Sequence, residues 1–334
     1  CLFMDLQEFL DEWNNQSDTV LVHTSGSTGK PKAMRVEKRR MEASAQLTCD
    51  FLGLTPGDTA LLCMPLDYIA GKMVVVRSIV RGLRLVSVKP SGHPLAGIDA
   101  PPTFAAMVPM QVYNSLQTER ELTMLKAVKH LIIGGGAIDK TLETELQNFP
   151  NAVWSTYGMT ETLSHIAMRR ISGSDADCWY TPFDGVNVSL DTDGCLVIDA
   201  PAVCPSVLHT NDIAELHADG RRFRILGRKD NVICSGGIKI MMEGVEDALR
   251  PHLSVPFTIT KRVDTRLGEA VVILFEGTDA MIDTVKEVCL RVLPKYWRPK
   301  NYTPINQIPI TETGKPARAE AQRIANEAHA GSCM

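Results

Sequence analysis

The residue types at 24–32 predict a loop that suits the binding of phosphate groups. The segment reads Thr-Ser-Gly-Ser-Thr-Gly-Lys-Pro-Lys and follows an apolar stretch. Its two glycines permit unusual backbone angles, and its four hydroxyls can join backbone amides around phosphate oxygens. It is not a Walker loop, because only two residues separate Gly26 from Gly29 and Pro31 follows Lys30. Loops rich in serine and glycine are also common on surfaces that bind nothing, so other segments must support the phosphate assignment.

The elements that must position this loop alternate along the chain. Short apolar runs predict buried strands and helical patterns predict helices between them, which together favour an α/β domain with a largely parallel sheet. The predicted strands cover residues 20–22, 59–63, 83–88, 103–108 and 130–133, and the predicted helices 39–52 and 141–148.

The character of the chain changes twice after this alternating part. From 184 to 218 short strands are broken by Asp-Thr-Asp-Gly and by proline, and 220–226 adds a hairpin, so we expect a small β subdomain over about 184–226. A helix at 243–249, a strand at 270–275 and a helix at 278–293 then predict a second, α+β domain. We therefore expect two domains, 1–229 and 230–334.

Composition limits the partners and the compartment. The 334 residues include 35 Lys and Arg against 39 Asp and Glu, a net charge of −4, so the chain lacks the basic field that nucleic acids or anionic membranes require. Its nine cysteines form no Cys-x-x-Cys pair, which argues against a zinc ribbon and suits a reducing cytosol. No apolar run is long enough to span a bilayer, and no cleavable signal is visible. We expect a cytoplasmic location.

Residues 24–32 resemble the signature loop of acyl-adenylate-forming enzymes, the superfamily of acyl-CoA synthetases, peptide-synthetase adenylation domains and luciferases. Five further segments match that superfamily in its order. They are Gly-Gly-Gly-Ala at 134–137, Tyr-Gly-Met-Thr-Glu-Thr at 157–162, Asp212, Gly-Arg-Lys-Asp at 227–230 and Thr-Gly-Lys-Pro-Ala-Arg at 313–318. The resemblance covers nearly the whole chain. It implies a large α/β adenylate-forming domain with mostly parallel sheets and a small, mobile α+β C-terminal domain.

The resemblance also implies a reaction in two steps and the cofactors ATP, Mg²⁺ and CoA. A carboxylate first attacks the α-phosphate of ATP, and the thiol of CoA then attacks the acyl-adenylate. Lys315, Thr160 and Glu161 would be the catalytic residues, with Glu161 as the Mg²⁺ ligand. The implied nucleotide-binding residues are Thr24, Ser25, Gly26, Ser27, Thr28, Gly29, Lys32, Gly135, Gly136, Ala137, Ser155, Tyr157, Gly158, Asp212 and Arg228.

A hinge would let one site perform both steps. In the superfamily the small domain rotates about the position that Asp230 occupies here. One pose would deliver Lys315, and the other would bring the CoA-binding residues Ser235, Gly236 and Gly237 to the acyl-adenylate.

Within the superfamily the chain is most similar to the o-succinylbenzoate–CoA ligases of menaquinone biosynthesis. The similarity rests on Ser-Gly-Gly at 235–237, on the polar tail Leu-Ser-His at 163–165 and on a short length. The substrates would be an aromatic carboxylic acid, ATP and CoA. This acid carries a second carboxylate that needs a basic partner, for which Lys72, Arg77 and His165 are candidates. Another acyl- or aryl-CoA ligase and a non-catalytic nucleotide-binding homologue are the alternatives, and homo-oligomerisation is left open.

Overall fold

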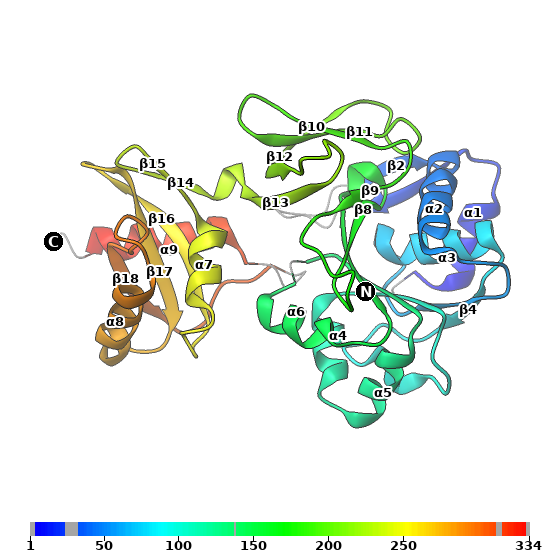
Figure 1. The fold of residues 1–334 in the computed structure, drawn as a ribbon, viewed down its shortest axis with the longest axis horizontal. Coiled ribbons are helices and arrows are strands. Elements are labelled where there is room, and N and C mark those ends of the chain that lie inside the picture. The colour runs from blue at the N-terminus through cyan, green and yellow to red at the C-terminus, as the bar shows by residue number, and fades with distance from the viewer. Residues whose placement is uncertain (1–3, 24–32, 137, 312–315, 332–334) are drawn as a thin grey trace. The chain divides into compact units, whose positions relative to one another are not determined.

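The computed structural model of the chain describes residues 4–23, 33–136, 138–311 and 316–331 (Figure 1). It divides into two compact units. The first comprises residues 1–191, 197–210 and 216–224, and the second comprises 192–196, 211–215 and 225–334.

A seven-stranded sheet forms the centre of the first unit. Its strand order is β4-β3-β5-β6-β7-β8-β9, in which β4 to β7 run parallel and β8 and β9 are antiparallel to their neighbours. This arrangement confirms the predicted α/β class, and β3 to β6 confirm four of the predicted strands. The bounds are β3 Thr59–Leu62, β4 Arg84–Ser87, β5 Phe104–Met107, β6 His130–Ile133, β7 Ala152–Gly158, β8 His165–Arg170 and β9 Thr181–Pro182.

Helices cover this sheet, and an apolar core that includes Leu61, Leu131 and Val153 fills the space between them. Helices α2 and α3 pack against each other, and each ends at a glycine in the left-handed conformation, Gly53 and Gly82 (Figure 1). The predicted helices at 39–52 and 141–148 are confirmed as α2 and α6. The bounds are α1 Leu6–Asn14, α2 Lys38–Leu52, α3 Ile69–Arg81, α4 Pro109–Leu116, α5 Glu119–Ala127 and α6 Lys140–Gln147.

Two smaller sheets accompany the large one. Strands β1 (Thr19–His23) and β2 (Ala33–Glu37) pair antiparallel. A four-stranded sheet has the order β10-β11-β12-β13 and contains the short strands that the sequence predicts between 184 and 226. Its bounds are β10 Asn187–Leu190, β11 Cys195–Asp199, β12 Leu208–Leu216 and β13 Phe223–Arg228.

The second unit contains a five-stranded sheet with helices on both faces (Figure 1). The side chains of its central strand, β17, alternate between two cores. Ile273 and Phe275 pack with α7 and α8, whereas Val272 and Leu274 pack against α9. The bounds are β14 Val232–Ser235, β15 Ile238–Met241, α7 Met242–Leu249, β16 Phe257–Asp264, β17 Gly268–Glu276, α8 Ile282–Val292, β18 Asn301–Ile305 and α9 Arg318–Gly331.

Arg318 fastens the start of α9 to the rest of the second unit. Its guanidinium donates to both carboxylate oxygens of Glu246, at 2.6 and 2.8 Å, and to the carbonyl oxygen of Ile259 at 2.9 Å. The Glu246 side chain is buried, so removal of Arg318 would leave an enclosed carboxylate without its counter-charge.

Two general features follow from the described part of the chain. Each helix there is too short or too polar to cross a lipid bilayer. The seven cysteines in these residues are all free, and five of them are buried.

We expect Arg318→Ala to lower the free energy of unfolding of the second unit by roughly 3 kcal/mol, because it breaks a largely buried, bidentate ion pair. Urea denaturation followed by circular dichroism measures this change. Arg323→Ala is the matched control, since Arg323 lies on the same helix but pairs with Glu320 and Glu327 at the surface. Equal stability of the two variants would contradict the anchoring role of Arg318.

Candidate functional site

The structure describes most of the site residues that the sequence predicts. The remainder lie outside the described residues, and their roles stay predictions. They are Thr24, Ser25, Gly26, Ser27, Thr28, Gly29, Lys32, Ala137 and Lys315.

The motif at 157–162 lies where β7 turns back into β8. The pairing of the two strands shifts between Tyr157 and Gly158, so that Gly158 faces His165. A methyl group on Gly158 would lie 2.3 Å from the carbonyl oxygen of Ser164 and 2.4 Å from the Cα atom of His165. Only glycine permits two backbones to approach this closely. Gly158 therefore determines how closely β7 approaches Ser164 and the first residue of β8, His165.

The turn after this glycine is held by a buried threonine. The Thr162 hydroxyl accepts from the amide of Met159 at 3.0 Å and donates to the carbonyl oxygen of Ser164 at 2.7 Å. Leu163, between them, has φ of 65° and is the only non-glycine residue with positive φ among the residues described. Such a conformation costs about 1–3 kcal/mol and persists only where surrounding contacts enforce it. The positive φ of Leu163 lets the chain reverse here, which leaves Ser164 half-buried and His165 buried.

Thr160 and Glu161 lie on the short 3-10 helix Thr160–Thr162 within this turn. Glu161 is exposed, and no group of three or more His, Cys, Asp or Glu side chains among the described residues could hold a metal by itself. Mg²⁺ in nucleotide sites is held by one or two carboxylates together with substrate phosphates. A single accessible carboxylate such as Glu161 fits that requirement.

Tyr157 is half-buried and backed by two aromatic rings. The centroid of Phe223 lies 5.2 Å away in a T-shaped arrangement, and that of Tyr180 lies 5.8 Å away. The Tyr180 hydroxyl is 2.8 Å from the hydroxyl of Ser155, which is itself buried. Because Phe223 and Tyr180 limit the movement of the Tyr157 ring, that ring can present a fixed surface to a flat base.

Gly135 and Gly136 lie at the same edge of the large sheet as Tyr157. They follow β6, and β6 and β7 are parallel neighbours in which Ile133 pairs with Ser155. Ligands of α/β sheets bind at the carboxyl ends of such strands. The structure therefore brings Gly135, Gly136 and the motif at 157–162 to one edge.

Arg77, on α3, is a buried cation. Its side chain is 2% exposed, and its Nη2 donates to the hydroxyl of Ser164 at 2.6 Å. Its Nε is enclosed without a hydrogen-bond partner, and it forms no ion pair with an Asp or Glu among the described residues. Burial lowers the pKa of Arg77 to about 10, so the guanidinium stays protonated at neutral pH. The fold thus encloses a positive charge with no described counter-ion.

His165 is buried beside Arg77 and is held on three sides. Its Nε2 lies 3.0 Å from the Thr48 hydroxyl and its Nδ1 lies 3.2 Å from the Ser164 hydroxyl. Phe183 packs against the imidazole ring at a centroid distance of 5.6 Å. Burial, and then the charge of Arg77, hold the pKa of His165 well below its usual value. The imidazole is therefore neutral at pH 7.

Lys72 lies on the same helix as Arg77 but has an acidic partner. Its Nζ is 3.0 Å from a carboxylate oxygen of Glu12 and 5.0 Å from the ring centroid of Phe9, both on α1. The second oxygen of Glu12 accepts from the amide of Leu21 in β1 at 2.8 Å. Lys72 therefore joins α1, β1 and α3, and its charge is compensated within the protein.

In the second unit, Arg228 connects Asp212 with Asp230. Its Nη1 donates to Asp212 at 3.0 Å and its Nη2 donates to Asp230 at 3.1 Å. Asn211 also donates to Asp230, at 3.2 Å. The predicted ribose-binding carboxylate, the predicted arginine and the predicted hinge residue are thus one hydrogen-bonded group.

Residues 235–237 lie at the tight hairpin between β14 and β15. Gly236 and Gly237 have φ of 57° and 82°, as the two central residues of a type I′ turn require. The hairpin alone accounts for both glycines, and their CoA-binding role stays a prediction together with that of Ser235.

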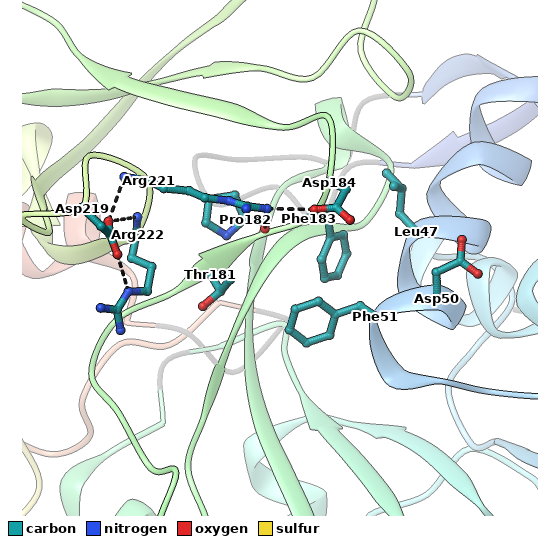
Figure 2. A pocket seen from close by; sticks show the side chains of 10 residues that line it. All are labelled: Leu47, Asp50, Phe51, Thr181, Pro182, Phe183, Asp184, Asp219, Arg221 and Arg222. Carbon is teal, nitrogen blue, oxygen red and sulfur yellow. Dashed lines mark hydrogen bonds and ion pairs between the residues drawn. The ribbon is translucent and has the colours of Figure 1, made fainter.

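The first unit contains a pocket of about 410 Å³ (Figure 2). Its walls combine the apolar side chains of Leu47, Phe51 and Phe183 with the ion pair of Arg221 and Asp184. None of the residues that line it is a predicted site residue. Among its lining residues, Phe183 contacts the imidazole ring of His165.

Sequence reasoning missed Thr48, Tyr180 and Phe223, and it named Ser164 only as part of the polar segment at 163–165, without a role of its own. A signal existed for Thr48, because it occupies the apolar face of α2 that Met41, Ala45 and Leu52 define, and a polar residue there needs a buried partner. Tyr180 and Phe223 come together only through the tertiary fold, so no local pattern marks them.

Comparisons with known proteins agree with one another: the matches are AMP-binding enzymes and CoA ligases. The chain matches the family described as AMP-binding enzyme over residues 6–197. It is 25% identical to a 2-succinylbenzoate–CoA ligase of Bacillus cereus, over 95% of this chain and 72% of that protein. It is 28% identical to a probable 2-succinylbenzoate–CoA ligase of Mycobacterium tuberculosis, over 92% and 85% of the two chains.

One solved structure is similar in both sequence and fold. It is the crystal structure of an acyl-CoA synthetase (AMP-forming)/AMP-acid ligase II-like protein from Dyadobacter fermentans. The identity is 31% and the TM-score is 0.65, with 94% of this chain and 91% of that chain covered.

We expect Gly158→Ala to destabilise the first unit by about 3 kcal/mol, because its methyl group would overlap the backbone of Ser164 and force the strands apart. Thermal unfolding measures this loss. Gly97→Ala is the control, since a methyl group there would meet the nearest atom, of Val88, at an ordinary 3.6 Å. Similar melting temperatures for the two variants would argue against the close contact.

Proposed function

The chain belongs to the family of AMP-binding enzymes, and on that basis we propose that it is an ATP-dependent acid–CoA ligase whose acid is o-succinylbenzoate. The observation that carries the choice of acid is the buried guanidinium of Arg77, which has no described carboxylate partner. The names of the relatives from Bacillus cereus and Mycobacterium tuberculosis support the same acid.

The energetic cost of burying Arg77 supports a dicarboxylic substrate. An ion removed from water without a counter-charge costs several kcal/mol even after the protein relaxes. A carboxylate that enters beside Arg77 and Ser164 would recover much of that cost through charge-assisted hydrogen bonds. An acid with only the carboxylate that reacts would leave Arg77 uncompensated. In this proposal Arg77 holds the second carboxylate, and the neutral His165 shapes the site.

The proposed reaction has two steps. A carboxylate oxygen of the acid attacks the α-phosphorus of ATP, and the bond from that phosphorus to the pyrophosphate oxygen breaks. The sulfur of CoA, after loss of its proton to solvent, then attacks the acyl carbon and AMP leaves. Lys315 and Thr160 would stabilise the negative charge that develops on the phosphate oxygens in the first step. Mg²⁺, when bound through Glu161 and the phosphates, would neutralise part of the same charge.

The other parts of the site have roles in this proposal that match their chemistry. Asp212 would accept hydrogen bonds from the ribose hydroxyls, and Arg228 would hold that carboxylate in place. Tyr157 would stack on adenine. Asp230 would be the hinge, and residues 235–237 would bind CoA. The domain limits of 1–229 and 230–334 belong to the same proposal.

Two other functions predict different behaviour. A ligase for a monocarboxylic acid would gain nothing from Arg77, and a nucleotide-binding homologue without catalysis would release no pyrophosphate with any acid. A panel of acids in a pyrophosphate-release assay separates both from the proposed function.

We expect Arg77→Met to lower kcat/KM for o-succinylbenzoate about tenfold to a hundredfold and to change the value for benzoate little, because one charge-assisted partner of the second carboxylate is lost. The same variant keeps or gains stability, since it removes an uncompensated buried charge. Pyrophosphate release and thermal unfolding measure the two effects.

Lys72→Met is the control on the same helix. It breaks the ion pair with Glu12, so it lowers the melting temperature without changing the preference between the two acids. The assignment of Arg77 is wrong if Lys72→Met, and not Arg77→Met, removes the preference for o-succinylbenzoate.

We expect Asp212→Asn to raise the KM for ATP about tenfold or more and to leave the KM for the acid nearly unchanged. An asparagine nitrogen cannot accept from a ribose hydroxyl, so one charge-assisted hydrogen bond is lost. Initial rates at varied ATP measure this. Asp193→Asn serves as the control, because Asp193 pairs with Lys229 at the surface of the same unit. An unchanged KM for ATP in Asp212→Asn would remove this residue from the nucleotide site.

A further inference from the structure

Thr48 is a fully buried hydroxyl that makes two hydrogen bonds. It donates to the carbonyl oxygen of Ser44, one turn earlier in α2, at 3.1 Å, and it lies 3.0 Å from Nε2 of His165. A threonine has one hydroxyl proton. Because that proton goes to Ser44, the second contact is satisfied only if His165 donates from Nε2.

The other side of the imidazole agrees with the same tautomer. The guanidinium of Arg77 can only donate, so the Ser164 hydroxyl accepts from its Nη2 at 2.6 Å. The single proton of Ser164 then goes to Nδ1 of His165, at 3.2 Å. With Nε2 protonated through its contact with Thr48, Nδ1 is the unprotonated nitrogen of the neutral imidazole and can accept this proton. The hydrogen bonds run in one direction, from Arg77 through Ser164, His165 and Thr48 to Ser44.

We propose that Thr48 is a positioning residue for the acid site. Thr48 fixes the Nε2-protonated tautomer of His165, and this tautomer directs the hydroxyl proton of Ser164. The Ser164 oxygen is then oriented to accept from Arg77 and holds that guanidinium in place. The role in acid binding rests on the proposed function, whereas the tautomer does not. Thr48 lies on α2 and Arg77 on α3. Thr48 therefore acts on Arg77 through two intervening side chains, those of His165 and Ser164.

Loss of the Thr48 hydroxyl would reverse part of this chain of hydrogen bonds. In Thr48→Val, Nε2–H would face an apolar methyl group, and a buried donor without an acceptor is costly. The imidazole would then move its proton to Nδ1 and donate to Ser164. The Ser164 oxygen would accept from both His165 and Arg77, and its own proton would have to turn away. Arg77 would lose its fixed orientation.

The test combines a spectroscopic and a kinetic measurement on the full chain. Nitrogen-15 NMR of histidine side chains reports which ring nitrogen carries the proton, and the signal of His165 is assigned by its absence in His165→Gln. We expect the Nε2-protonated form in the wild type and in Thr48→Ser, and the Nδ1-protonated form in Thr48→Val. The KM for o-succinylbenzoate rises about three- to tenfold in Thr48→Val and recovers in Thr48→Ser, while the KM for ATP stays constant.

Ser78→Ala is the matched control. Its hydroxyl makes the same kind of hydrogen bond one turn back along a helix, to the carbonyl oxygen of Val74 at 2.9 Å, but is not part of the His165 cluster. It should leave the histidine spectrum and the acid KM unchanged.

Three results would overturn the inference. The first is an Nδ1-protonated His165 in the wild type, which does not depend on the folding of a Thr48 variant. The second is an unchanged tautomer in a folded Thr48→Val, and the third is a changed tautomer with an unchanged KM for the acid. A wild-type enzyme that activates no acid would instead overturn the proposed function, and the histidine spectra would still decide the tautomer.

Discussion

The contact between Gly158 and the backbone at 164–165 is the constraint on which the geometry of Arg77, Ser164 and His165 depends. A methyl group at Gly158 would lie 2.3 Å from the Ser164 carbonyl oxygen, so β7 and β8 meet at a distance that only glycine allows. That distance fixes the depth at which Ser164 and His165 enter the unit. The positive φ of Leu163 then follows, because the chain must reverse within the few residues that separate the two strands. The same turn leaves Thr160 and Glu161 on the accessible side.

Lys72 and Arg77 show how one helix can carry two buried cations with different consequences. Lys72 has its counter-charge inside the fold, in Glu12, and contributes to stability by joining three elements. Arg77 has a serine hydroxyl and a neutral histidine as neighbours, which orient it without neutralising it. A protein that keeps an uncompensated charge in its core gives up stability there, which is the usual trade between stability and function at a binding site. The partner, and not the residue type or its burial, distinguishes the two cations.

Much of the fold could be predicted from the sequence, because strands β3 to β6 coincide with short runs rich in apolar residues, and helices α2 and α6 with helical patterns between such runs. The sequence could not distinguish among Lys72, Arg77 and His165 as partners of a second carboxylate. The distinction depends on the ion pair of Lys72 with Glu12, which lies 60 residues away in the chain. The pattern of α2 did contain a signal for Thr48, a hydroxyl within an apolar face, but its partner His165 is 117 residues away. The linkage of Asp212, Arg228 and Asp230 likewise requires that β12 and β13 be neighbours.

In the proposed function, the hydrogen bonds from Arg77 to α2 would also influence which acid the protein prefers. Ser164 and Thr48 each have a single hydroxyl proton, so the hydrogen bond between Ser164 and His165 reverses only with a change at Thr48. The orientation of Arg77 therefore depends on Thr48, a residue of α2 outside all six sequence motifs. Two chains with the same motif at 157–162 but a different residue at the position of Thr48 would hold the arginine differently. Acid preference in such chains is then a property of the packing between α2, α3 and β8, and the motif at 157–162 alone is insufficient to specify it.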